Sequence, residues 1–174
     1  MSVVTVYIGL AMLIGAGLAV QLSMISAMSL LRGSFEATWL SLLATVGGFT
    51  FLVTVRALQR APATLPAPFD GAILYLLVAV AAAAGLAVVI RGVPSYFAVT
   101  GLFAIPLLVG AGVVGSRLGI GLYLSSVVAG QLVSSVVLDH VGAFGIPVRR
   151  VDLARVGGVA LLVLGVALVR GVKT

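Results

Sequence analysis

The sequence contains no cysteine and no asparagine. Without cysteine the chain has no disulfide, no reactive thiolate and no cysteine-ligated zinc or iron–sulfur centre. Without asparagine it has no site for N-glycosylation. Histidine and lysine each occur once, as His140 and Lys173, so no histidine pair can hold a metal and no glycine-rich phosphate loop carries a lysine. These absences argue against an enzyme and predict neither a cofactor nor a bound metal.

Charged residues are also scarce. They make up 8% of the 174 residues, whereas a soluble domain usually carries about 25%. With 62% hydrophobic residues and a mean hydropathy of +1.34, the chain has too little polar material to cover a soluble surface, so a lipid bilayer is the expected partner. The net charge of +6 comes mostly from arginines at the ends of apolar runs. No clustered basic face of the kind that binds nucleic acid is present.

Six apolar segments approach the length of about 20 residues that a membrane-spanning helix needs. Their continuous hydrophobicity favours helices over the alternating pattern of a membrane β-barrel. The joints between them are too short for a further domain. We therefore expect an all-α polytopic membrane protein, with residues 1–174 forming a single compact bundle of five or six transmembrane helices. The expected spans are approximately residues 3–30, 37–55, 72–90, 96–114, 118–138 and 156–169.

The segment 96–114 contains two features that affect helix geometry. Pro106 removes one backbone donor, which commonly kinks a membrane helix, either as a static bend or as a hinge. Gly110 to Gly115 reads GAGVVG and matches the dinucleotide-binding pattern G-x-G-x-x-G. That pattern needs a preceding strand and an acidic residue about 20 positions further on, whereas residue 135 is serine. Close helix packing or a flexible point near the proline explains these glycines better than a nucleotide site does.

Small side chains recur at every fourth residue in two segments, which places them on one face of each helix. In lipid, such stripes allow helix backbones to approach closely and so mark helix contacts. Each stripe is expected to face a neighbouring helix, either within the chain or across a dimer interface. The first stripe comprises Ala11, Gly15, Ala19, Ser23 and Ala27, and the second comprises Ser126, Gly130 and Ser134.

A polar line runs along the end of the fifth segment. Gln131, Ser135 and Asp139 are spaced four residues apart and share one helix face. Polar groups within a membrane are costly and usually face the bundle interior or a wet cavity. The line therefore predicts part of a substrate or ion pathway, and Gln21 in the first segment is a candidate partner for it.

Structural roles are also open for these polar residues. Gln131 alternatively forms a hydrogen bond across two helices. Asp139 alternatively lies among lipid headgroups, caps the following turn, or pairs with Arg149 or Arg150. His140, the next residue, is expected to be an interface residue rather than a proton relay.

The C-terminal third resembles the YdcZ-type family of the drug/metabolite transporter superfamily. The resemblance rests on Gly130-Gln131-Leu132, the Leu138-Asp139-His140 ending, the Gly145-Ile146-Pro147 turn and a final glycine-rich helix. It covers residues 94–170 well and residues 15–56 weakly. It implies a small, multi-pass bacterial inner-membrane protein, about half of a full-length transporter, and no particular substrate.

Two features differ from what the resemblance implies. The family usually has five spans, so that the segment 72–90 looks like an additional one. Related small multidrug-resistance proteins use a glutamate in the first helix to bind cations and protons. No acidic residue occurs between Met1 and Gly33, so that mechanism does not carry over to this chain.

Together these features predict a small-molecule transporter of the drug/metabolite type, acting as a homodimer or beside a paralogue. Gln21 and Gln131 would line a polar site near the membrane midplane, with Asp139 near its mouth. The rival hypothesis is a membrane subunit that stabilises or regulates a partner without transporting anything. In a six-span arrangement the ten basic residues divide five against five between the two sides. Such a tie predicts insertion in both orientations, unless the first helix or a partner protein fixes one.

Overall fold

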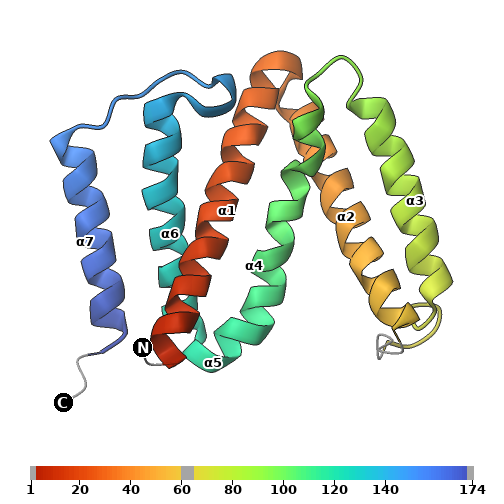
Figure 1. Cartoon of the computed structure of the whole chain (residues 1–174), viewed down its shortest axis with the longest axis horizontal. Coiled ribbons are helices and arrows are strands. Elements are labelled where there is room, and N and C mark those ends of the chain that lie inside the picture. Colours follow the sequence, from red (N-terminus) through yellow and green to blue (C-terminus); the bar gives the residue numbers. More distant parts are fainter. Residues whose placement is uncertain (1–2, 60–64, 172–174) are drawn as a thin grey trace. The chain divides into compact units, whose positions relative to one another are not determined.

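The structure is a computed structural model that describes residues 3–59 and 65–171. These residues form helices joined by short connections, and no strand occurs among them (Figure 1). Three segments with 3-10 or π geometry interrupt the α-helices, namely η1 (Ser95–Ala104), η2 (Ala111–Gly115) and η3 (Ala143–Gly145). The α-helices are α1 (Val3–Arg32), α2 (Ser34–Leu58), α3 (Ala72–Val89), α4 (Ile105–Gly110), α5 (Ser116–Leu118), α6 (Ile120–Val141) and α7 (Leu153–Val169).

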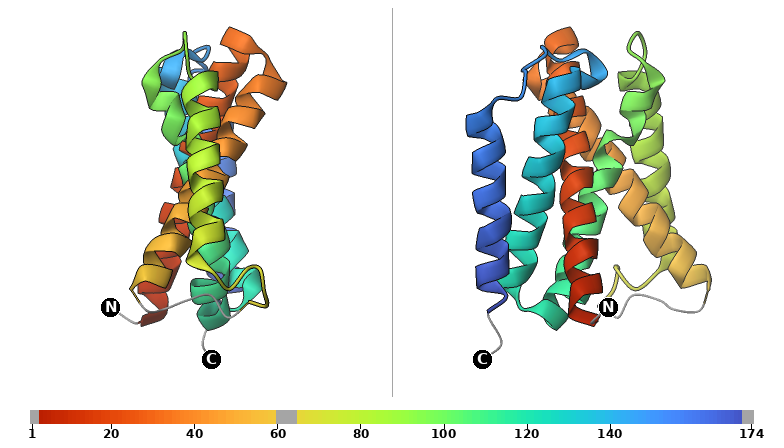
Figure 2. Two further views of the ribbon diagram at one scale, coloured as in Figure 1. Left: turned by 90° about the vertical axis from the view of Figure 1, so that its right-hand side faces the viewer. Right: turned by 60° about the vertical axis from the view of Figure 1, so that its left-hand side comes forward.

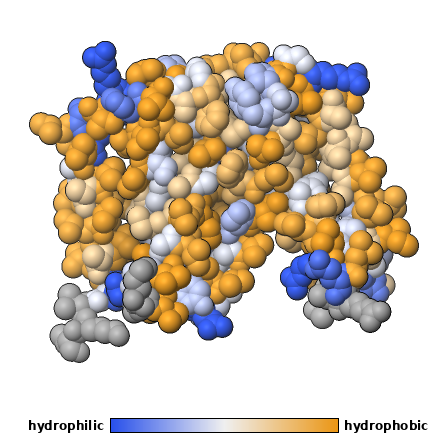
Figure 3. All heavy atoms as spheres, viewed as in Figure 1, coloured by the Kyte–Doolittle hydropathy of each residue, from blue (hydrophilic) through white to orange (hydrophobic). Residues whose placement is uncertain are grey.

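Five helical segments of the described chain are long and apolar enough to cross a membrane. The helix α7 adds a shorter apolar segment of 17 residues, about 26 Å long against a hydrocarbon core of roughly 30 Å. Large apolar side chains such as Leu13 and Leu161 remain 69% and 71% exposed. Hydrophobic residues dominate the face seen in Figure 3, and the most hydrophilic ones gather at helix ends. The expectation of an all-α polytopic membrane protein is confirmed.

The chain divides into two compact units, one made of residues 28–105 and the other of residues 1–27 and 106–174. In the unit 28–105, α2 packs against both α3 and η1. A Cβ added to Gly101 would collide with the carbonyl oxygen of Ser41 and lie 2.6 Å from the Thr45 hydroxyl. The same hydroxyl donates to the Gly101 carbonyl at 2.8 Å. Backbone contact through a glycine, reinforced by a threonine, thus joins α2 to η1.

The other unit contains α4 to α7 together with most of α1. Tyr123 is fully buried at its centre and packs with Ala11, Val114 and Val127. The Tyr123 hydroxyl donates to the Leu107 carbonyl at 2.8 Å, within α4 and four residues before η2 begins. The helices α6 and α7 lie side by side and run in opposite directions (Figures 1 and 2).

Two of the connections are single glycines. Gly33 alone separates α1 from α2, which begins at Ser34. Ser116 and Arg117 lie in α5, and Gly119 alone separates α5 from α6. Gly33 and Gly119 have φ of 99° and 82°, a region that glycine enters without the steric clash of a Cβ.

The expected fourth span is not one regular α-helix. It begins as the 3-10 helix η1, continues as α4, widens to the π geometry of η2 and ends as α5. Pro106 is the second residue of α4, directly after η1, and has no N–H to donate to the preceding 3-10 turn, so it stands at the change of helix type. The neighbouring glycines are used for packing in at least one place, because a Cβ on Gly110 would lie 2.6 Å from Ile14 Cδ1 and 2.9 Å from the Tyr123 hydroxyl.

Candidate substrate pathway

The helices α1 and α6 touch through their backbones. A Cβ added to Gly15 would collide with the Val127 carbonyl oxygen and lie 2.8 Å from the Gln131 backbone nitrogen. A Cβ added to Gly130 would collide with the Met12 carbonyl and lie 2.6 Å from its Cα. Only a residue without a side chain permits this crossing, which lies at the midpoint of α6 (Ile120–Val141).

The other small residues of the two stripes surround the crossing. Ala19 and Ser23 on α1 are buried, as is Ser126 on α6, whereas Ser134 is half-buried. The Ser126 hydroxyl donates to the Leu122 carbonyl of its own helix at 2.7 Å. Its contribution to the contact is therefore its small volume. The outer members of the first stripe, Ala11 and Ala27, are also buried.

The three residues of the polar line on α6 differ in the partners of their side chains. Ser135 donates to the Leu132 carbonyl of its own helix at 3.0 Å. Gln131 is half-buried, and among residues 3–59 and 65–171 its side-chain amide takes part in no hydrogen bond. Gln21 on α1 is likewise half-buried, with its amide oxygen hidden from solvent.

Asp139, the last member of the line, is engaged at the start of α7. Its carboxylate lies 3.7 Å from the Arg155 guanidinium, with both side chains about a third exposed at 36% and 33%. One alternative predicted from the sequence was an ion pair of Asp139 with Arg149 or Arg150. Arg149 instead donates its backbone N–H to the Asp139 carbonyl at 2.8 Å. That predicted ion pair was therefore wrong, because the loop folds back and brings Arg155, in the first turn of α7, to the end of α6.

Two further bonds fasten the same loop. The Val151 N–H donates to Nδ1 of His140 at 3.3 Å, so the histidine serves the connection between the helices. Asp152 caps α7 by accepting from the Arg155 N–H at 2.8 Å. Aspartate directly before an apolar run is a typical N-cap, and this signal would have placed the start of α7 at Leu153 instead of residue 156.

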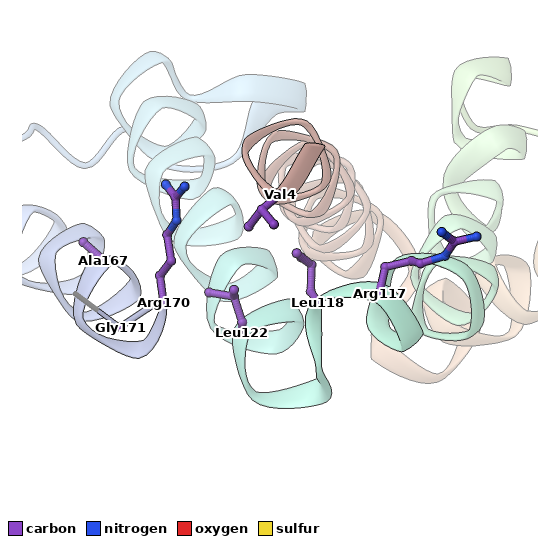
Figure 4. A pocket seen from close by; sticks show the side chains of 7 residues that line it. All are labelled: Val4, Arg117, Leu118, Leu122, Ala167, Arg170 and Gly171. Atoms are coloured by element: carbon purple, nitrogen blue, oxygen red, sulfur yellow. The ribbon is translucent and has the colours of Figure 1, made fainter. Parts of the chain in front are cut away.

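Cavities in the unit that contains α6 include one of about 370 Å³ between α1 and α6, near Gly17 and Ser134. Another, of about 170 Å³, lies between α1, α6 and α7 near Met12 and Val166. A third, of about 600 Å³, opens where α1 and α6 begin and α7 ends, with Arg170 on its rim (Figure 4). None of them is lined by the predicted pathway residues Gln21, Gln131, Ser135 and Asp139. The described residues also hold no cluster of three or more potential metal ligands.

Comparison with protein families returned one informative match. Residues 63–168, more than half of the chain, match the family described as "Putative inner membrane exporter, YdcZ". The chain belongs to this family. Comparisons with curated proteins and with solved structures returned no match.

Membership of the YdcZ family confirms the resemblance seen in the C-terminal third and supports a multi-pass inner-membrane transporter rather than an enzyme. The match begins before Ala72 and ends within α7, so it includes α3, the helix that looked additional to the family. Residues 15–56, where the resemblance was weak, lie outside it. The family description names no substrate, so the substrate must be sought from the chemistry of the chain.

Proposed function

We propose that this YdcZ-family chain exports a small molecule as a dimer, and that Gln131 belongs to a polar site near the membrane midplane. The observation that carries this proposal is the state of the Gln131 side chain. It is half-exposed at the midpoint of α6 and takes part in no hydrogen bond with the described residues. An amide left without partners in hydrocarbon is unfavourable by several kcal/mol. A substrate, water or a second subunit would supply the missing partners.

The arrangement of α7 supports the dimer. Val166 is its one buried residue, and Cβ atoms added to Gly157, Gly158 or Gly165 would meet nothing within 4 Å. Glycines that allow close approach are typical of helix–helix interfaces in membranes. A second copy of the chain, or a paralogue, would cover this face of α7.

The other polar residues take secondary roles in this proposal. Gln21 would contribute to the same site from α1, and Ser135 would extend it along α6. Asp139 lies eight residues beyond Gln131, about 12 Å along the helix, and would stand at the mouth together with its partner Arg155. Their ion pair would hold the start of α7 in place beside that mouth.

Transport can be tested without knowing the substrate. Everted membrane vesicles that contain the chain are energised and incubated with a small-molecule extract of the host cells, and mass spectrometry identifies the solutes that accumulate. Gln131→Leu is expected to lower the accumulation of those solutes roughly tenfold or more, corresponding to about 1.4 kcal/mol of lost binding. Gln59→Leu is the matched control, because Gln59 is exposed at the end of α2.

Two results would count against the proposal. If Gln131→Leu transports like the unaltered chain and has the same thermal stability, the residue serves neither the pathway nor the packing. If no solute accumulates above the level of empty vesicles, and a second membrane protein co-purifies in fixed ratio, the chain is a stabilising or regulatory subunit instead.

A further inference from the structure

The cavity of about 600 Å³ combines apolar walls with a positive rim. Val4, Leu118 and Leu122 form the apolar part, and Arg117 and Arg170 stand at its edges. Figure 4 shows the two arginines on opposite sides, with the Arg170 guanidinium beside the cavity and the Arg117 side chain directed outward. The volume falls within the range of about 300–1,000 Å³ that is typical of ligand pockets.

The charged side chains that line this cavity are both positive. Among the described residues neither Arg117 nor Arg170 pairs with a carboxylate. The acidic residues of this unit, Asp139 and Asp152, lie at the other end of α6 and at the start of α7. Asp139 is 17 residues from Leu122, about 25 Å along the helix axis, and its charge is paired with that of Arg155.

Two long helices add to this positive charge. The helices α1 and α6 both begin at the cavity, with Val4 and Leu122 in their first turns. The amino-terminal end of a helix carries a partial positive charge of roughly +0.5. The C-terminal end of α7 has the opposite sign, and Arg170 follows it directly. The mouth of the cavity therefore favours an anion, whereas its walls favour hydrocarbon.

We propose that this cavity binds an anionic phospholipid, with the phosphate at the arginine-bearing rim and the upper part of an acyl chain against Val4, Leu118 and Leu122. Arginine at the end of a span lies at headgroup depth and binds phosphate through several donors. Basic pockets between membrane helices are a known setting for anionic headgroups. The site is separate from Gln131, so it does not depend on the proposed transport.

The test is competition between two lipids on the purified full chain. Detergent micelles receive equal amounts of phosphatidylglycerol and phosphatidylcholine with the same acyl chains, and native mass spectrometry measures the ratio of the two bound lipids. The unaltered chain is expected to retain phosphatidylglycerol preferentially. Arg170→Gln should reduce this preference about fivefold, since one arginine near a headgroup contributes roughly a factor of five. The double variant with Arg117→Gln should reduce it further.

Three controls make the result specific. The double variant Arg56→Gln with Arg149→Gln removes the same charge from exposed positions outside the cavity and should leave the preference unchanged. Ala167→Phe keeps both arginines but fills the cavity wall, and should abolish retention even if the arginine variants prove difficult to purify. Glycerol 3-phosphate, a headgroup without acyl chains, should not displace the bound lipid.

Specific outcomes would overturn the proposal. An unchanged preference in the double variant of Arg117 and Arg170 would show that no anionic lipid sits at this rim. An equal loss in the control double variant would show only a general charge effect. Displacement by glycerol 3-phosphate would indicate a site for a free phosphate compound rather than for a lipid.

Discussion

The crossing of α1 and α6 makes a sharp prediction about alanine at Gly15. The new Cβ would lie 2.8 Å from the Gln131 backbone nitrogen and closer still to the Val127 carbonyl oxygen. Real Cβ atoms essentially never approach another atom to within 3.0 Å. Both obstacles are backbone atoms, so no side-chain rotation relieves the overlap and the two helices must separate.

The expected loss of stability follows from two opposing terms. Overpacking a well-packed contact costs about 1–3 kcal/mol. Replacing glycine by alanine inside a helix returns up to about 1 kcal/mol of helix propensity. With the full propensity gain, the net destabilisation of Gly15→Ala is about 0–2 kcal/mol, which lowers the melting temperature of a chain of this size by up to about 8 °C.

Thermal unfolding in detergent, followed by circular dichroism, measures this effect. Gly9→Ala is the matched control, because Gly9 lies on the same helix and its added Cβ would meet nothing within 4 Å. Gly130→Ala should behave like Gly15→Ala, with Gly121→Ala, also in open space, as its control. The two controls should leave the melting temperature unchanged or raise it slightly.

The double variant of Gly15 and Gly130 tests whether both glycines serve one contact. Residues in contact give non-additive effects. Once the first alanine has separated the helices, the second finds room, so the double variant should lose less stability than the two single variants together. Equal melting temperatures for Gly15→Ala and Gly9→Ala would refute the tight crossing, and strict additivity would place the two glycines in separate contacts.

Two further expectations concern the core and the orientation of the chain. Tyr123→Phe removes the hydroxyl that donates to the Leu107 carbonyl. Because hydrogen bonds between membrane helices average about 0.6 kcal/mol, the variant should melt about 1–2 °C lower. An unchanged melting temperature would show that the bond is not a net stabiliser. If the chain crosses the membrane six times, five basic residues fall on each side. Reporters fused after the last residue and active only inside or only outside the cell should then both give signal, and removal of Arg117 should shift their ratio. A one-sided signal that ignores this change would rule out dual insertion.

Much of the fold follows from composition and length. The shortage of charge requires lipid as the covering phase, and continuous apolar runs of about 20 residues require helices within it. The third expected span and α3 both begin at residue 72. The starts of α2 and α7 were placed late, because Ser34 and Leu153 directly follow a turn glycine and a capping aspartate, and local chemistry of this kind outweighs hydropathy at helix ends.

The fourth span shows where hydropathy stops being informative. Residues 95–118 are apolar throughout, and an average over such a window carries no information about 3-10, α or π geometry. The proline and the glycines near Pro106 signalled an irregularity. The span also receives a hydrogen bond from another helix, because Tyr123 donates to the Leu107 carbonyl. A tertiary contact of this kind has no counterpart in the local sequence.

The polar line on α6 shows the same limit at the candidate site. A spacing of four residues correctly places Gln131, Ser135 and Asp139 on one helix, but it does not say where each side chain finds its partner. A serine hydroxyl reaches the carbonyl of its own preceding turn, as Ser135 does, and a carboxylate at a helix end reaches an arginine across the loop, as Asp139 does. Gln131, by contrast, takes part in no hydrogen bond with the described residues. Of the three residues it is therefore the one whose side chain still needs a partner, and a search for the substrate should begin there.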